Sequence, residues 1–213
     1  MPSAQAIDCR QCDRLAAFLD AVKARQPDYY AKPVPAFGDD MAKLLIIGLA
    51  PGMHGANRTG RPFTGDYAGI LLYETLYKFG FSSHHKSVSA DDSLVLNGCR
   101  ITNAVKCLPP ENKPKPDEVR QCGSYLEAEI IQFITTGGKA LLVLGTVAHQ
   151  ASLRALGLKL KDFPFGHGAV HDLPNGLILY DSYHCSRYNT QTKRLTTAMF
   201  EQIFEQIKKD QID

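Results

Sequence analysis

The sequence predicts an α/β fold, a three-layer αβα sandwich with a central four-stranded parallel sheet. Four short apolar runs indicate the strands, at residues 43–50, 99–105, 139–145 and 176–182. Between them, apolar residues recur every three or four positions, which is the period of a helix with one buried face. Because the four runs are apolar throughout, the strands should be covered by helices on both faces, as is typical of parallel sheets.

Helices are expected before, between and after these strands. Their apolar positions are Leu15, Phe18, Leu19 and Val22; residues 70–79; Val119, Cys122, Leu126, Ile130 and Phe133; and Leu195, Met199, Ile203 and Ile207. Another helix should follow the third strand with Thr146 as its N-cap, and Asp8 is a candidate cap for the first helix. The stretch DLPNG at 172–176 predicts a turn and a small hairpin just before the fourth strand.

Length and composition bound the kind of protein. A chain of 213 residues with 44% hydrophobic content can build one core, so we expect a single domain over residues 1–213. There is no run of about 18 apolar residues that could span a membrane, and the N-terminus lacks the pattern of a secretory signal. We therefore expect a cytoplasmic protein, and a monomer, since nothing in the sequence indicates an oligomer.

Long polar loops follow three of the four strands. The first, GLAPGMHGANRTGRPFTGD at 48–66, holds five glycines and is far longer than a turn requires. Ligands of α/β sheets bind at the carboxyl ends of the strands, so these loops predict one shared site. The net charge of +2 neither requires nor excludes a nucleic acid. The loop cations expected to face such a polyanion are Arg58, Arg61, Lys106, Lys113, Lys115, Arg187 and Lys193.

Three polar side chains in these loops form the candidate catalytic set, namely Asp66, Asn103 and His184. Taken singly, each has an ordinary explanation, because a histidine at a strand end is often only hydrogen-bonded and an asparagine often caps a turn. At one edge of a sheet they would supply a carboxylate to orient water, an amide to read a base edge and a donor for developing negative charge.

Six cysteines occur, and four of them suggest a metal site. Cys9 and Cys12 form a Cys-x-x-Cys pair, and Cys107 and Cys122 follow the second strand. Such cysteines bind metal or act in redox chemistry more often than they form disulfides in the cytoplasm. Four thiolates suit either zinc or an iron–sulfur cluster. Cys122 could also be a small core residue, as Cys99 is expected to be.

Four segments together resemble a known family: CRQC at the N-terminus, the loop 48–66, TNAVKCLPPENKPKP and SYHCSRYNTQTKRLT. Their order and spacing are similar to those of the uracil-DNA glycosylases of family 5 (type B), which are iron–sulfur enzymes close to family 4. The start GLAP favours family 5, because family 4 has an acidic residue in place of Leu49. The resemblance covers nearly the whole chain.

The resemblance implies a role for each candidate residue. Glycosylases extrude their target nucleotide from the duplex, so Phe63 would stack on the flipped base and Asn103 would read its Watson–Crick edge. Asp66 would position or activate water, or stabilise the sugar cation, and His184 would steady the charge on the leaving base. The backbone along the sugar would come from Gly48, Leu49, Ala50, Pro51 and Gly52.

The resemblance also implies a cofactor, a [4Fe-4S] cluster in preference to zinc. Its ligands would be Cys9, Cys12, Cys107 and Cys122. Its role would be structural, because breaking a glycosidic bond needs no electrons.

Three features depart from the family pattern or leave a choice open. The chain reads His184-Cys185-Ser186 where the family reads His-Pro-Ser. Without the proline, the backbone beside the candidate catalytic histidine is less restrained. Tyr188 lies in the region that enters the duplex, either as a wedge or as an ordinary surface tyrosine. Gly52 stands where strictly uracil-specific enzymes carry a tyrosine, which predicts that larger deaminated bases such as hypoxanthine are also accepted. Met53 or His54 could instead close that wall, with Gly52 serving only backbone geometry.

Two other functions remain compatible with these residues. The first is a non-catalytic nucleic-acid-binding protein of the same fold, although a pure binder needs only phosphate contacts. The second is a zinc-stabilised hydrolase of small nucleosides, which the basic loops disfavour. The leading prediction is therefore a DNA-repair glycosylase whose partner is DNA containing uracil or another deaminated base.

Overall fold

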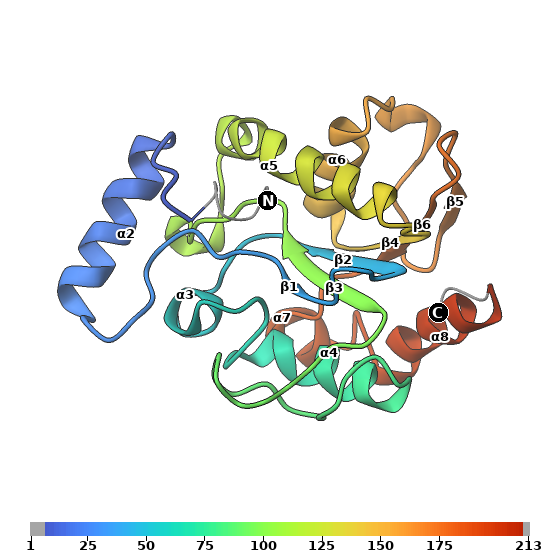
Figure 1. Cartoon of the computed structure of the whole chain (residues 1–213), viewed down its shortest axis with the longest axis horizontal. Coiled ribbons are helices and arrows are strands. Elements are labelled where there is room, and N and C mark those ends of the chain that lie inside the picture. Colours follow the sequence, from blue (N-terminus) through green and yellow to red (C-terminus); the bar gives the residue numbers. More distant parts are fainter. Residues whose placement is uncertain (1–6, 211–213) are drawn as a thin grey trace.

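The computed structural model describes residues 7–210, and its centre is a six-stranded sheet (Figure 1). The strands are β1 (Phe37–Gly38), β2 (Leu44–Gly48), β3 (Cys99–Asn103), β4 (Ala140–Leu144), β5 (Val170–Asp172) and β6 (Ile178–Ser182). Their spatial order is β1-β3-β2-β4-β6-β5. The middle strands β3, β2, β4 and β6 run parallel, whereas β1 and β5 pair antiparallel at the two edges. The predicted four-stranded parallel core is confirmed.

Of the two edge strands, the sequence predicted β5 but not β1. Strand β5 forms the predicted hairpin with β6, and the turn lies between Asp172 and Ile178. Strand β1 has only two residues, which is too short for any hydrophobic period to show. It therefore escaped prediction.

Alternate residues of the central strands face two different layers. Leu44 and Ile46 of β2 pack into one core cluster, and Leu45 and Ile47 pack into the other. The covering helices are α4 (Tyr67–Lys78) and α8 (Thr197–Lys209) on the first face, and α5 (Pro116–Thr135) and α6 (Thr146–Ala155) on the second (Figure 1). The three-layer αβα arrangement is confirmed.

The first helix, α2 (Asp13–Arg25), lies beside the sheet and brings the N-terminal segment to the rest of the fold. Leu19 and Val22 of α2 pack against Leu108 in the loop after β3. Arg14 donates hydrogen bonds of 2.7 Å to both carboxylate oxygens of Glu118 on α5. These contacts set the chain just before α2 beside the loop that follows β3.

Both predicted helix caps were wrong. The N-cap of α2 is Cys12, with no side-chain hydrogen bond, so Asp8 lies outside the helix start. Thr146 is the first residue of α6, and Gly145 is its N-cap. Gly145 has a φ of 96°, a conformation that glycine adopts without strain.

The remaining helices are short, namely α3 (Ala56–Thr59), η1 (Pro110–Asn112), η2 (Leu160–Asp162) and α7 (Arg187–Gln191). Three of them, α3, η1 and α7, belong to the loops that follow β2, β3 and β6. Within residues 7–210, no helix has both the length and the apolar character needed to cross a lipid bilayer.

The register of β2 and β3 brings the first two long loops together. Gly48 pairs with Asn103 at the carboxyl end of both strands. Beyond this pair, the N–H of Ala104 donates to the carbonyl of Gly48 at 2.9 Å, and the N–H of Val105 donates to that of Leu49 at 3.0 Å. The start of the glycine-rich loop is thus fixed to the start of the loop that follows Asn103.

Candidate active site

A cleft of about 730 Å³ opens where the loops after β2, β3 and β6 meet. Asp66, Asn103 and His184 line it together, from the loop after β2, the end of β3 and the loop after β6. Of the residues expected along the sugar and the base, the cleft is lined by Leu49, Ala50, Gly52 and Phe63. Gly48 lies behind Asn103 and Phe63, and Pro51 is buried outside the lining.

Asp66 is the N-cap of helix α4, and its Oδ1 accepts a hydrogen bond of 3.1 Å from the N–H of Gly69. Burial raises the pKa of the Asp66 carboxyl, while the backbone N–H groups of Gly69 and Ala68 act in the opposite direction. Gly55 lies against the other oxygen, and a Cβ at that position would collide with Oδ2. A glycine at 55 therefore lets the loop close over this carboxylate.

Asn103 is the last residue of β3 and is 2% exposed. Its side-chain Oδ1 is buried and has no hydrogen-bond partner among the described residues. Gly48 stands beside it, and a Cβ there would meet both Oδ1 of Asn103 and the ring of Phe63. An orphaned acceptor in a cleft wall is costly unless a ligand supplies the missing donor.

Phe63 and His184 form an aromatic pair on the cleft wall. Their ring centroids are 5.9 Å apart, with 29° between the planes. Phe63 has a φ of 53°, a strained conformation for a side chain of this size that often marks a functional position. Burial lowers the pKa of His184 to about 4, so its imidazole is neutral at physiological pH. It can donate one hydrogen bond without carrying a charge.

The backbone of His184 is restrained despite the absence of the proline. The side-chain Nδ2 of Asn189 donates a hydrogen bond of 2.8 Å to the carbonyl of His184. Cys185 is fully buried in the core cluster that also holds α4 and α8. The hydroxyl of Ser186 caps helix α7 by accepting from the N–H of Asn189. These contacts restrain the main chain on the C-terminal side of His184.

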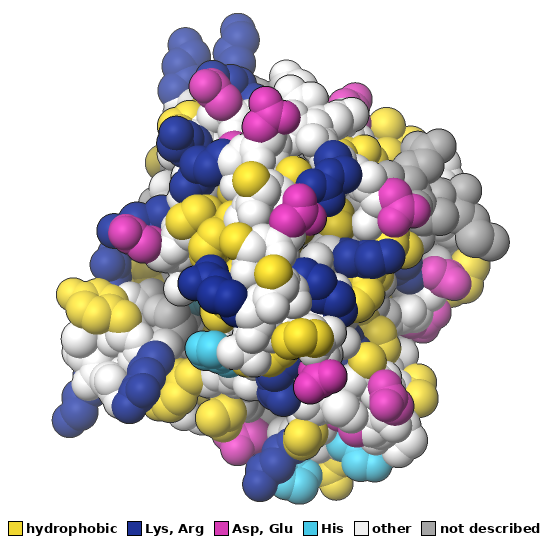
Figure 2. Space-filling model, turned by 90° about the vertical axis from the view of Figure 1, so that its left-hand side faces the viewer, with side chains coloured by type: hydrophobic (Ala, Val, Ile, Leu, Met, Phe, Trp, Pro, Cys, Tyr) yellow, Lys and Arg dark blue, Asp and Glu magenta, His cyan; other side chains and the backbone are white. Residues whose placement is uncertain are grey.

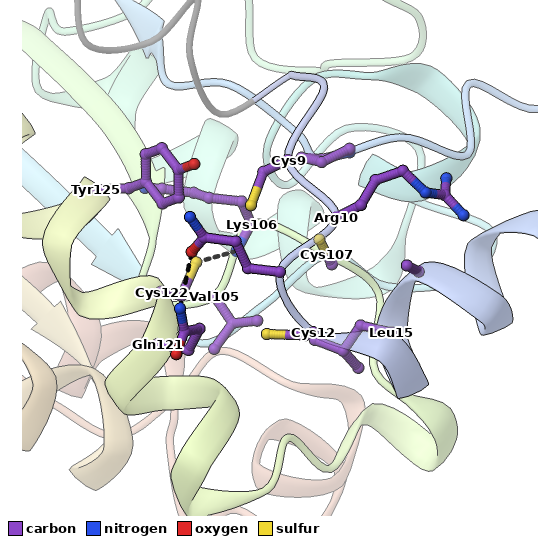
Figure 3. A pocket seen from close by; sticks show the side chains of 13 residues that line it. Cys9, Arg10, Cys12, Leu15, Val105, Lys106, Cys107, Gln121, Cys122 and Tyr125 are labelled. Atoms are coloured by element: carbon purple, nitrogen blue, oxygen red, sulfur yellow. Dashed lines mark hydrogen bonds between the residues drawn. The ribbon is translucent and has the colours of Figure 1, made fainter.

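Four cysteines surround a second cavity (Figure 3). Cys9 and Cys12 come from the segment before α2, Cys107 from the loop after β3, and Cys122 from α5. Figure 3 shows their sulfur atoms directed into the same space, and the N–H of Lys106 donates to Sγ of Cys122 at 3.3 Å. Within residues 7–210, no three His, Cys, Asp or Glu side chains lie close enough to hold a single metal ion.

The other two cysteines lie elsewhere. Cys99 and Cys185 belong to the core cluster on the opposite face of the sheet from Cys122. The expectation that Cys99 is a core residue is confirmed.

Two of the cations expected to face the groove are buried instead. Arg61 is 4% exposed and donates to Asp92 at 2.6 Å and to the hydroxyl of Thr64 at 3.0 Å. Lys106 is 1% exposed and pairs with Glu129 at 2.6 Å. Their assignment to a DNA-facing surface was wrong, because each is paired with a carboxylate, partly exposed at Asp92 and buried at Glu129, that sequence spacing does not reveal. The predicted cations that remain exposed are Arg58, Lys113, Lys115, Arg187 and Lys193.

The structure adds site residues that the sequence reasoning missed. Tyr67 and Asn112 line the cleft, and the guanidinium of Arg187 lies 5.8 Å from the centre of the Tyr67 ring. Tyr67 directly follows Asp66 and opens α4, a signal that could have found it. Asn57 in α3 does not line the cleft, but it is fully buried and neither polar atom of its amide has a partner among the described residues. Figure 2 shows Lys and Arg side chains interspersed with Asp and Glu on the face that lies at the left of Figure 1.

Comparisons with known proteins agree with this arrangement. The family model described as the uracil DNA glycosylase superfamily matches residues 35–208. A type-5 uracil-DNA glycosylase of Thermus thermophilus is 46% identical over 206 residues, covering 94% of this chain and 93% of the relative. A type-5 enzyme of Pyrobaculum aerophilum is 37% identical, covering 96% and 89%.

Type 4 is more distant. A type-4 uracil-DNA glycosylase of Archaeoglobus fulgidus is 30% identical over 168 residues, covering 78% of this chain and 69% of the relative. Both the order of the site loops and these similarities lead to one assignment. The chain belongs to the uracil DNA glycosylase superfamily and, within it, is related to the type-5 uracil-DNA glycosylases.

Proposed function

We propose that this protein is a monofunctional DNA glycosylase that hydrolyses the N-glycosidic bond of uracil flipped out of DNA and leaves an abasic site. The observation that carries the proposal is the convergence of Asp66, Asn103 and His184 on one cleft, beside Phe63. The similarity to uracil-DNA glycosylases over most of the chain supports the same activity. DNA is the proposed partner, and the expected monomeric state and cytoplasmic location remain predictions.

Asn103 is the residue proposed to select uracil. Its buried Oδ1 lacks a donor, and the N3–H of uracil would supply one. Cytosine carries an acceptor at N3, so it would leave Oδ1 unsatisfied at a cost of about 1–3 kcal/mol. Phe63 forms the wall on which the flipped base would stack.

Asp66 and His184 are proposed to act on the two charges that develop as the bond breaks. Positive charge builds on the sugar, and negative charge builds on the departing base. The carboxylate of Asp66 stabilises the sugar cation and takes a proton from the water whose oxygen bonds to C1′. The C1′–N1 electron pair leaves with uracil, and neutral His184 donates a hydrogen bond to O2 of that anion.

We propose that the four-cysteine cavity holds a [4Fe-4S] cluster. Four thiols facing one cavity are a suitable donor set, and the resemblance to the iron–sulfur families 4 and 5 implies such a cluster. A single zinc would hold its sulfurs at about 2.3 Å, which needs a tighter group than the described residues provide. When bound, the cluster would supply a structural link between the N-terminal segment, the loop after β3 and α5.

Metal analysis tests the cluster. Protein purified without oxygen should be brown and contain about four irons per chain. Cys107→Ala should bleach it, whereas Cys99→Ala, in the opposite core, should keep its iron for each folded chain. A colourless protein with one zinc per chain would overturn the assignment.

A cleavage assay separates the three candidate functions. End-labelled DNA with a single uracil is incubated with the protein and then treated with alkali, which cuts at abasic sites. Cleavage at uracil alone supports the glycosylase, and Asp66→Asn serves as the inactive control. Tight binding without cleavage would favour the non-catalytic binder, and release of uracil from free deoxyuridine would favour the nucleoside hydrolase.

We also propose that hypoxanthine and other deaminated bases are substrates. Gly52 lines the cleft and has no side chain to narrow it, although Met53 and His54 line the same wall. A Cβ at Gly52 would lie 3.1 Å from Oδ2 of Asp66, so Gly52→Ala is the necessary control for Gly52→Tyr. The wild type should release both bases, and the tyrosine variant should lose hypoxanthine before uracil relative to the alanine variant. Release of uracil alone by the wild type would place the gate at another residue.

A further inference from the structure

Lys106 is a buried cation placed directly behind the base-reading residue. Its Nζ donates three hydrogen bonds: to Oγ1 of Thr102 at 2.6 Å, to the main-chain carbonyl of Asn103 at 2.8 Å and to Oε2 of Glu129 at 2.6 Å. An ammonium group has three donors, so all of its hydrogen-bonding capacity is used. Thr102 also donates to the same oxygen of Glu129, at 2.7 Å.

A contribution to stability does not by itself explain why a lysine is buried at position 106. Burying an ammonium and a carboxylate costs several kcal/mol per ion, and apolar residues of similar volume often serve a core equally well. The geometry suggests a different reason, because one of the three bonds goes to the residue proposed to read the base. The bonds from Lys106 hold the end of β3 to helix α5, where Glu129 lies.

The three residues after Asn103 are held by main-chain hydrogen bonds, whereas the Oδ1 of Asn103 itself has no partner among the described residues. The N–H groups of Ala104 and Val105 are bonded to the glycine-rich loop, and the carbonyl of Lys106 accepts from the N–H of Val34 at 2.7 Å. The N–H of Lys106 donates to Sγ of Cys122. Lys106 thus touches Asn103 with its side chain and the four-cysteine cavity with its backbone.

We propose that Lys106 is a positioning residue for base recognition. Its ammonium group holds the carbonyl of Asn103, so that the side-chain amide of Asn103 stays directed into the cleft. Its backbone N–H bonds to Cys122, so the same lysine links the orientation of Asn103 to the four-cysteine cavity. This inference rests on the proposed glycosylase function. Misplacement of a reading group by about 1 Å can cost about 100-fold in rate. Removal of the Lys106 contact should therefore reduce kcat on uracil by about 10- to 100-fold.

The test replaces both charges, so that neither ion is left buried alone. Lys106→Met/Glu129→Gln keeps the shapes of both side chains and removes the bond to Asn103. The control is Arg14→Met/Glu118→Gln, an ion pair that joins the same helix α5 to α2 without touching Asn103. The control pair should leave kcat within about twofold of the wild type.

The decisive readout is a double-mutant cycle with Asn103→Ala. If Lys106 acts through the amide of Asn103, the paired substitution should lower kcat in the wild type but change it by less than about twofold when that amide is absent. Affinity for DNA that carries a tetrahydrofuran abasic analogue should stay within about twofold, because no base is read there. Equal losses of kcat in both backgrounds would show a merely structural role and overturn the proposal.

A second variant keeps the test decisive if the methionine variant does not fold. Lys106→Gln/Glu129→Gln retains a donor of shorter reach near the carbonyl of Asn103, so its kcat should fall below that of the wild type and change by less than about twofold in the Asn103→Ala background. Equal losses of kcat in both backgrounds, with an unchanged melting temperature, would contradict the positioning role. Cleavage at uracil by the wild type distinguishes failure of the positioning role from failure of the glycosylase proposal. If the wild type cleaves and every Lys106 variant has the same kcat, only the positioning role fails. If the wild type does not cleave, the glycosylase proposal fails as well.

Discussion

The two walls of the cleft are built in opposite ways. Behind the wall formed by loop 48–66 and Asn103, the cations Arg61 and Lys106 are buried and paired with carboxylates. On the wall formed by 184–192, Arg187 faces solvent and Tyr188 is 70% exposed. Two cations of the first wall thus hold the protein's own structure, while Arg58 of the same loop and Arg187 of the second wall stay exposed and available to a DNA backbone. Cations with similar sequence surroundings therefore do different work, and substitutions can separate the two roles.

The largest effect is expected from the carboxylate of the first wall. Asp66→Asn should reduce kcat by about 10²–10⁴-fold while DNA affinity changes little, because the carboxylate acts on the transition state. The asparagine still offers an oxygen to cap α4, so the melting temperature should hold. Single-turnover cleavage and a binding titration with uncleaved DNA measure the two quantities separately. A variant with wild-type kcat would move the water-positioning role to Asn103 or His184.

Loss of the buried cation Arg61 should cost stability more than DNA binding. Its guanidinium is bonded to Asp92, Ser87 and Thr64 and lies 4.7 Å from the centre of the Phe37 ring. Arg61→Met leaves the partly exposed carboxylate of Asp92 with only its backbone donors, the N–H groups of Val88, Ser89 and Leu94, and should lower the free energy of unfolding by about 1–3 kcal/mol. Denaturant unfolding measures it, and the salt dependence of DNA binding should be unchanged. A lower salt slope with full stability would restore Arg61 to the DNA-facing set.

A pH experiment addresses His184, which belongs to the second wall but packs on Phe63 of the first. Burial lowers its pKa to about 4 from the ordinary value near 6.5. Because it is already neutral, kcat should show no step from this residue between about pH 6 and pH 8. The unfolded chain binds the proton more readily, so stability should fall as the pH drops from about 6.5 toward 4.

Urea unfolding across this pH range tests the histidine directly. His184→Gln should remove the part of the pH dependence that falls in this window. A step in wild-type kcat near pH 6.5 that is absent in the variant would show that His184 is solvated and titrates normally.

The sequence predicted the repetitive parts of the fold well and the paired charges poorly. The four apolar runs and the three- and four-residue repeats gave the central strands and the main helices, because burial of one face requires those periods. Gly145 is the N-cap of α6, a position that we expected for Thr146. The positive φ of this residue, and not a capping side chain, decides which residue stands there. The partners Asp92 and Glu129 are 31 and 23 residues away from Arg61 and Lys106, a distance that no local pattern covers.

The site shows the same division. That Asp66, Asn103, His184 and Phe63 line one cleft was predictable, because each lies at or after the carboxyl end of a strand and the resemblance named them. Lys106 was taken for a DNA contact because it stands in the same basic loop. Its burial depends on the packing of α5 against β3, which only the three-dimensional structure reveals.

The smallest expected effect concerns the exposed cation Arg187 of the second wall. It lines the cleft beside Tyr67 and is not bonded to any carboxylate that the structure describes. Each phosphate contact contributes about 0.9 to the slope of log K against log salt, so Arg187→Met should lower that slope by about one. The matched control is Arg154→Met on α6, an exposed arginine outside the cleft, which should leave the slope unchanged. Neither variant should change the melting temperature, in contrast to Arg61→Met. If Arg187→Met and Arg154→Met both give the same slope as the wild type, Arg187 does not contact a phosphate. The proposed difference between the two walls would then not hold for the second wall.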